Sequence, residues 1–142
     1  MAAEYSYPLV QTIAEDENVI FLDGDRCCKK GYITHRSGSG VFRLKGAGNA
    51  CKTVYRVTFN ANIAVATGGT VGAISVALQE DGETLQNAVA TVVPAAIGDA
   101  FNVALTTFII IPCGCCVTVS VENISGTAID VTNSNIIIER VA

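Results

Sequence analysis

Apolar and polar side chains alternate along residues 55–63, and this pattern constrains the fold of the chain more than any other feature. Its apolar positions are Tyr55, Val57, Phe59, Ala61 and Ile63. Successive side chains of a β-strand point to opposite faces, so a period of two predicts a strand with one buried and one exposed face. Residues 117–122 repeat the pattern, with valine at every second position.

Further segments have the composition of strands and are separated by turn residues. They are residues 9–13, 19–22, 30–35, 40–45, 71–79, 84–92, 101–111, 127–132 and 135–141. The dipeptides Gly68-Gly69 and Asp81-Gly82 are typical of the turns between strands. The best helix candidate, residues 94–100, is short and contains Gly98, which favours a turn. We predict an all-β fold, a single-domain antiparallel jelly-roll sandwich of about ten strands with no substantial helix.

The first residues differ in character from the strand-rich remainder. Pro8 and the acidic run Glu15-Asp16-Glu17 indicate a segment that precedes the main sheets. We therefore expect an N-terminal arm at residues 1–18 and the β jelly-roll domain at residues 19–142. A chain of 142 residues is long enough to bury a core of its own.

The composition indicates self-association. Half of the residues are hydrophobic and 15% are charged, against about 25% charged in an average soluble domain. No apolar run reaches the ~18 residues that a membrane helix needs, so we expect no membrane partner. Residues 1–11 lack the basic start and apolar centre of a signal peptide, so we expect the protein to be made in a cytoplasm. A chain this apolar has more surface to cover than one subunit can hide, which predicts an oligomer.

The charges are segregated along the chain. Residues 26–56 hold eight of the nine cations and no acid, while the segments on either side are acidic. If residues 46–51 form a hairpin loop, alternation places four cations on one outer surface, and we predict that they dock onto an acidic partner. They are Arg43, Lys45, Lys52 and Arg56. The plain alternative is an ordinary solvated strand face. Nucleic acid is an unlikely partner, because Phe42 and Tyr55 fall on the inward face and offer no stacking platform.

Three of the six cysteines lie in the stretch PCGCC at residues 112–116, which has three interpretations. A redox centre would need a thiolate at a helix N-terminus, and a strand follows instead. A zinc site could be completed by Cys27 and Cys28, but adjacent strand residues point to opposite faces. We favour a turn of small buried residues that enters a strand, with Cys115 facing inward and Cys116 outward.

Other motifs do not amount to a catalytic site. Residues 46–53 nearly match a phosphate-binding loop, but a strand follows where that loop requires a helix. His35, the only histidine, has no partner placed by the sequence and is expected to pack or to lie at the surface. Asn123-Ile-Ser125 is a formal glycosylation acceptor, which we discount without a secretion signal. We expect no enzyme activity, no cofactor and no metal.

Four segments carry a resemblance to a known group of proteins: GYITHRSGSGVFRLKG (31–46), residues 54–83, VVPAAIGDAFNV (92–103) and FIIIPCGCCVTVSVEN (108–123). In these the chain resembles a family of small proteins from bacteriophages and prophages of anaerobic Firmicutes, typically virion components. The closing run of residues 136–140 is similar to the last strand of trimeric jelly rolls of the tumour-necrosis-factor type, which lies near the three-fold axis.

The resemblance implies a homotrimer that serves as a capsid decoration or head-fibre protein of the virion, with the major capsid protein or another virion protein as its partner. The residues expected at the subunit interface are Phe108, Ile110, Ile136 and Ile138. The alternative is a trimeric jelly-roll binding module that recognises a glycan or another host-surface ligand. The absence of tryptophan and the low aromatic content, 6%, argue against a glycan platform.

Overall fold

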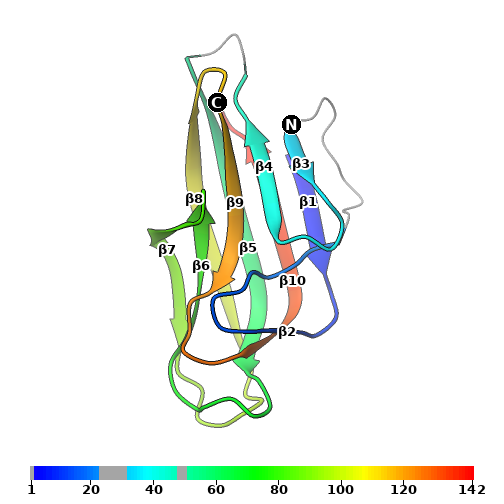
Figure 1. The fold of residues 1–142 in the computed structure, drawn as a ribbon, viewed down its shortest axis with the longest axis vertical. Coiled ribbons are helices and arrows are strands. Elements are labelled where there is room, and N and C mark those ends of the chain that lie inside the picture. Colours follow the sequence, from blue (N-terminus) through cyan, green and yellow to red (C-terminus); the bar gives the residue numbers. More distant parts are fainter. Residues whose placement is uncertain (1, 23–31, 48–50) are drawn as a thin grey trace.

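Two five-stranded antiparallel sheets pack face to face in a computed structural model that describes residues 2–22, 32–47 and 51–142 (Figure 1). In the first, which we call the β5 sheet, the order is β1 (Ala2–Tyr7), β10 (Ile129–Arg140), β5 (Lys52–Val65) and β8 (Phe101–Pro112), and β2 (Gln11–Ile13) also pairs with β10. In the second, the β9 sheet, the order is β3 (Ile33–His35), β4 (Val41–Lys45), β9 (Cys116–Asn123), β6 (Ile74–Glu80) and β7 (Glu83–Val92).

This architecture is the predicted all-β jelly-roll sandwich. The described residues form ten strands and no helix, and residues 94–100 lie in an irregular turn as expected. The alternation that predicted β5 is realised, because Tyr55, Val57 and Phe59 are fully buried between the sheets while Arg56 faces outward. Among the residues that the structure describes, no helix is long and apolar enough to cross a membrane.

The centre of the core is aromatic and joins the two sheets. Phe21 lies 5.4 Å from Phe42 and 6.2 Å from Phe59, measured between ring centroids. The Tyr55 hydroxyl donates a hydrogen bond of 2.8 Å to the Lys45 carbonyl and so connects β5 to β4 across the sandwich. Buried aromatic side chains contribute large apolar areas, and their tilted contacts fix how the sheets are oriented.

The segment expected as an N-terminal arm is part of the β5 sheet. β1 pairs with β10 along its whole length, from Ala2 opposite Glu139 to Tyr7 opposite Ser134. Ala3 and Tyr5 are buried in the common core. Residues 19–22 form no strand, although Val19 and Phe21 are buried.

The two strands expected at 127–132 and 135–141 form a single strand, β10. Its register shifts between Thr132 and Asn135, and Asn133 has a positive φ of 55°. The shift is a bulge, which adds an unpaired residue without ending the strand. Residues 133–134 therefore read as a break in the sequence pattern although the strand continues through them.

Two buried amides hold the first twenty residues in place, one within this segment and one from the sandwich. The Gln11 side chain donates to the Ile20 carbonyl and accepts from the Ile20 amide, both at 3.0 Å. The Asn123 amide nitrogen lies 3.0–3.2 Å from the carbonyls of Ile13, Ala14 and Thr127. Because buried polar groups are costly unless paired, these contacts hold the early segment in one position.

Candidate functional site

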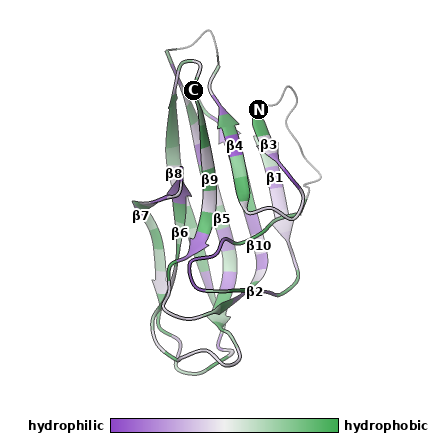
Figure 2. Ribbon diagram, viewed as in Figure 1, coloured by the Kyte–Doolittle hydropathy of each residue, from purple (hydrophilic) through white to green (hydrophobic). Residues whose placement is uncertain are grey.

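The outer face of β8 carries an uncovered apolar strip. Phe108 and Ile110 are 59% and 55% exposed, whereas the alternate residues Ile109 and Ile111 point into the core. Val54, half-buried on the outer face of β5, lies directly opposite Ile110 and widens the strip. Figure 2 shows the hydrophobic character of β8 toward the upper end of the sandwich. This end of β8 is apolar on both faces, and only its inner face is covered within one chain.

Ile136 and Ile138 do not share this exposure. Both are fully buried in the core between the sheets, and the outward position between them is Ile137. The prediction that these two side chains contact another subunit is therefore wrong, because the chain's own core already surrounds them. The error is one of strand phase, since a shift by one residue exchanges the two faces of a strand.

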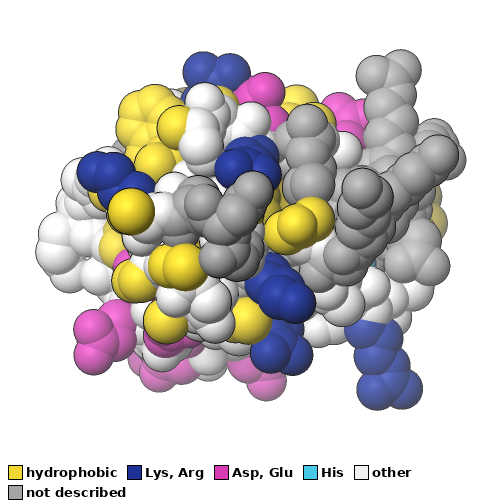
Figure 3. All heavy atoms as spheres, turned by 90° about the horizontal axis from the view of Figure 1, so that it is seen from above, with side chains coloured by type: hydrophobic (Ala, Val, Ile, Leu, Met, Phe, Trp, Pro, Cys, Tyr) yellow, Lys and Arg dark blue, Asp and Glu magenta, His cyan; other side chains and the backbone are white. Residues whose placement is uncertain are grey.

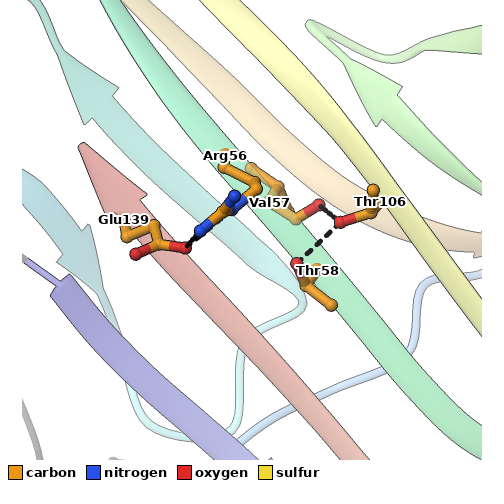
Figure 4. Close-up of polar contacts among 5 residues, drawn as sticks. All are labelled: Arg56, Val57, Thr58, Thr106 and Glu139. Atoms are coloured by element: carbon orange, nitrogen blue, oxygen red, sulfur yellow. Dashed lines mark hydrogen bonds and ion pairs between the residues drawn. The ribbon is translucent and has the colours of Figure 1, made fainter. Parts of the chain in front are cut away.

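Arg56 lies beside the apolar strip and is already paired. Its guanidinium donates through Nε, at 2.7 Å, and through Nη2 to the same carboxylate oxygen of Glu139 on β10 (Figure 4). Next to this ion pair, the hydroxyls of Thr58 and Thr106 lie 2.7 Å apart. Residues 26–56 contain no acid, but the charge of Arg56 is still neutralised. Glu139, which is distant in sequence, lies beside it on the neighbouring strand.

The four predicted docking cations do not lie on one surface. Arg43 and Lys45 point outward from β4 in the β9 sheet, and Lys52 and Arg56 point outward from β5 in the opposite sheet. Residues 46–51 therefore do not close a hairpin between paired strands, which corrects the premise of the prediction. Viewed onto the upper end, Lys and Arg side chains lie on several sides of the molecule rather than in one patch (Figure 3).

Arg43 and Lys45 line a small hollow on the outer face of the β9 sheet. The hollow has a volume of about 190 Å³, and Thr34 and Cys116 complete its lining. Thr34 lies opposite Arg43 on β3, and Cys116 lies opposite Lys45 on β9. Arg43 Nη2 donates to Cys116 Sγ at 3.4 Å. Sequence reasoning found the two cations but not the hollow, because their neighbours come from strands whose pairing it could not assign.

The cysteine stretch forms the turn between β8 and β9. Gly114 has a positive φ of 74°, a conformation that favours glycine, and β9 begins at Cys116. The interpretation as a turn that enters a strand is confirmed. The expected burial is not, because the side chains of Cys113, Cys115 and Cys116 are all exposed. Cys115 precedes the first paired residue of β9, so strand alternation does not yet apply to it.

The remaining motifs have structural surroundings. In residues 2–22, 32–47 and 51–142, no group of three or more His, Cys, Asp or Glu side chains could hold a metal ion. Cys27 and Cys28, the partners considered for a zinc site, lie outside the described residues. His35 stacks on Phe42 with ring centroids 4.4 Å apart, which fits the expected packing role.

Two further motifs are explained by their positions. Asn123, the formal glycosylation acceptor, is fully buried and cannot present its amide to a modifying enzyme. The near-match to a phosphate-binding loop leads into strand β5, as expected, and not into a helix.

Comparison with known proteins shows the class of fold. No protein-family model matches the chain, and no curated protein matches its sequence. Among solved structures, it is similar to the Eiger TNF from S. frugiperda, with a TM-score of 0.73 and 14% identity over 100% of this chain and 92% of that one. The globular domain of the zebrafish complement 1qA protein follows, with a TM-score of 0.62 and 16% identity over 94% of both chains. The PRD1 vertex protein P5 gives a TM-score of 0.54 and 13% identity over 99% of this chain and 96% of that one.

The chain therefore has a jelly-roll fold of the tumour-necrosis-factor type, as the resemblance of its closing residues implied. Identities this low show the fold alone, since one fold supports many functions.

Proposed function

We propose that the protein is a structural component of a bacteriophage virion, assembled as a homotrimer that decorates the capsid or forms a head fibre. The observation that carries the proposal is the exposed strip of Phe108 and Ile110 on β8. Contiguous exposed apolar side chains indicate a surface that is covered in the assembled protein. The vertex protein among the similar structures supports a virion role for this kind of fold.

The strip suits contact between copies of the chain. Its apolar side chains are bordered on β5 and β10 by the Arg56–Glu139 ion pair, and next to that by the Thr58–Thr106 hydroxyl pair. An apolar centre with a polar border is the usual composition of a specific protein interface.

The oligomer is tested by replacing Phe108 and Ile110 together with Asp. Light scattering should give about three times the 14.8 kDa chain mass for the wild type and a monomer for the variant, because two buried carboxylates would cost more than the interface can return. Val89 and Val93, exposed on and after β7, give a matched control when both are changed to Asp. A wild-type monomer at micromolar concentration, or a double variant that remains trimeric, would contradict the proposed interface.

The virion role is tested separately by mass spectrometry of particles purified through a density gradient. The protein should be present in them at a fixed ratio to the major capsid protein. Its absence from washed particles would overturn the role, whatever its oligomeric state.

A second candidate is a binding module for a host-surface glycan. The lower half of the β5 sheet carries a row of amides on its outer face, in which Asn102 bonds to Asn62 and Asn62 to Asn133. An asparagine amide offers both a hydrogen-bond donor and an acceptor, and it can therefore bind sugar hydroxyls, which also donate and accept. Binding of the isolated protein to host cell-wall polysaccharide, lost in Asn62→Ala, would favour this candidate over capsid decoration.

A further inference from the structure

The hollow on the β9 sheet, lined by Thr34, Arg43, Lys45 and Cys116, concentrates positive charge in a small volume. Arg43 and Lys45 are two residues apart on β4, so both side chains emerge on the same face. Neither forms an ion pair with a carboxylate in the described part of the chain. Two neighbouring cations without a counter-charge repel each other, and an anion between them removes that repulsion.

One carboxylate near the hollow, that of Asp81, contacts Thr118 and not Arg43. Thr118 lies opposite Arg43 on β9 and donates both its backbone amide and its hydroxyl to the Asp81 carboxylate, at 2.9 and 3.3 Å. Both contacts use Asp81 Oδ1, and no ion pair joins this carboxylate to Arg43 in the described part of the chain. The guanidinium of Arg43 has five N–H donors, and the contact with Cys116 Sγ uses only one of its nitrogens.

From this arrangement we propose that the hollow is a binding site for a tetrahedral oxyanion, a phosphate or sulfate group. The planar fork of Arg43 and the ammonium of Lys45 supply the charged donors from β4, and Thr34 on β3 and Cys116 on β9 border them on either side. A carboxylate offers two oxygens in one plane, whereas a phosphate or sulfate offers three or four in different directions. Arginine and lysine side by side recognise such groups, one by a bidentate contact and the other as a point charge.

The anion could be free or could be an ester on a sugar, and the chemistry of recognition is the same.

The site is independent of the proposed virion role, because it lies on the β9 sheet and the apolar strip lies on the β5 sheet. Loss of anion binding would leave the oligomer intact, and loss of the oligomer would leave the hollow intact.

Cys116 provides a direct reporter of occupancy. Its thiol lines the hollow, whereas Cys115, the preceding residue and also exposed, does not. Iodoacetamide should alkylate both thiols, and the rate at each is read by mass spectrometry of peptides. Inorganic phosphate, compared with chloride at equal ionic strength, should slow alkylation of Cys116 at least about threefold and leave the rate at Cys115 unchanged.

Substitutions then assign the effect to the hollow. Arg43→Gln and Lys45→Gln should each raise the phosphate concentration needed for half-protection by about tenfold, the change expected when one charge-assisted contact is lost. Lys52→Gln, an exposed lysine in the opposite sheet, is the matched control and should protect like the wild type. Equilibrium dialysis with labelled phosphate gives the same comparison without a thiol reagent.

The source of the anion is distinguished by a sulfated monosaccharide, inorganic sulfate and the neutral sugar. Protection by the sulfated sugar at lower concentration than inorganic sulfate assigns the site to an ester, and equal protection assigns it to a free anion. The proposal is overturned if phosphate and sulfate fail to protect Cys116 at tens of millimolar, if Cys115 is protected equally, or if Lys52→Gln loses protection as Arg43→Gln does.

Discussion

Single residues in this protein have effects that depend on what they touch rather than on their chemical type. Asn123 and Asn62 are both asparagines on strands, but Asn123 is fully buried and Asn62 is on the outer face. Similarly, Arg43 and Arg56 come from the same basic segment, and only Arg56 has a carboxylate partner in the described residues. The sequence identified these residue types, but their roles follow from neighbours that are distant in the chain.

Replacing Asn123 with Ala should destabilise the protein by at least about 2 kcal/mol, because its buried partners would be left unsatisfied. These include the carbonyls of Ile13 and Thr127, and the Ser125 amide that donates to Asn123 Oδ1 at 2.9 Å. Urea denaturation measures the loss. Asn62→Ala serves as the control and should stay within about 0.5 kcal/mol of the wild type. Equal stability of the two variants would show that the Asn123 contacts are not structural.

Glu80 gives a pH-dependent prediction. Partial burial, and then the negative charge of Asp81, raise the pKa of its carboxyl above the usual 4.5. A raised pKa means that the folded state favours the protonated form, so the stability associated with this group is present below pH 4.5 and is lost as the pH rises through the raised value. Glu80→Gln mimics the protonated form at every pH.

At pH 7 the Glu80→Gln variant should therefore be slightly more stable than the wild type, by no more than about 0.5 kcal/mol because the group is only partly buried and solvent screens its charge. The difference should vanish below pH 4. Chemical denaturation at both pH values measures it, with Asp99→Asn in an exposed turn as the control. A Glu80→Gln variant that is less stable than the wild type at pH 7 would show that the folded state does not favour the protonated carboxyl.

At the scale of elements, β1 is a strand of the sheet whose own residues alternate too weakly in hydrophobicity to predict it. Its inward residues are Ala3 and Tyr5, and its outward residues are small or polar. The alternation is present in the sequence, but alanine gives little apolar contrast, so we read the segment as an arm. Residues 2–7 form a strand because they pair with the edge of β10. Their own sequence does not show that this edge is available. By contrast, β5 and β9 have valine, isoleucine or aromatic residues at most inward positions and were predicted from their own residues.

Deleting residues 1–10 should thus be severely destabilising and not merely shorten a flexible end. The deletion removes the buried Tyr5 side chain and exposes the edge of β10; loss of a large aromatic side chain from a core alone costs about 3–5 kcal/mol. Thermal unfolding followed by circular dichroism should show either a much lower midpoint or aggregation. A truncated protein that melts at the wild-type temperature would restore the interpretation as an arm.

At the scale of the whole molecule, the alternation of apolar and polar residues was sufficient to predict the fold class but not to locate the candidate site. Local alternation determines which side chains face inward, whereas the pairing of strands is decided by contacts between distant segments. β4 and β5 are neighbours in sequence, which favours a hairpin, but they lie in different sheets. That single error placed four cations on one surface and concealed the hollow that two of them share with Thr34 and Cys116.

The position of β10 between β1 and β5 determines when the protein can fold. Until residues 129–140 have left the ribosome, β1 has no partner strand and the inner edge of β5 is open, although both were synthesised long before. Pairings of such separation in sequence make folding slow, on the order of milliseconds to seconds. The nascent chain must therefore wait with open strand edges and an exposed core until its last strand arrives, and this state favours chaperone binding.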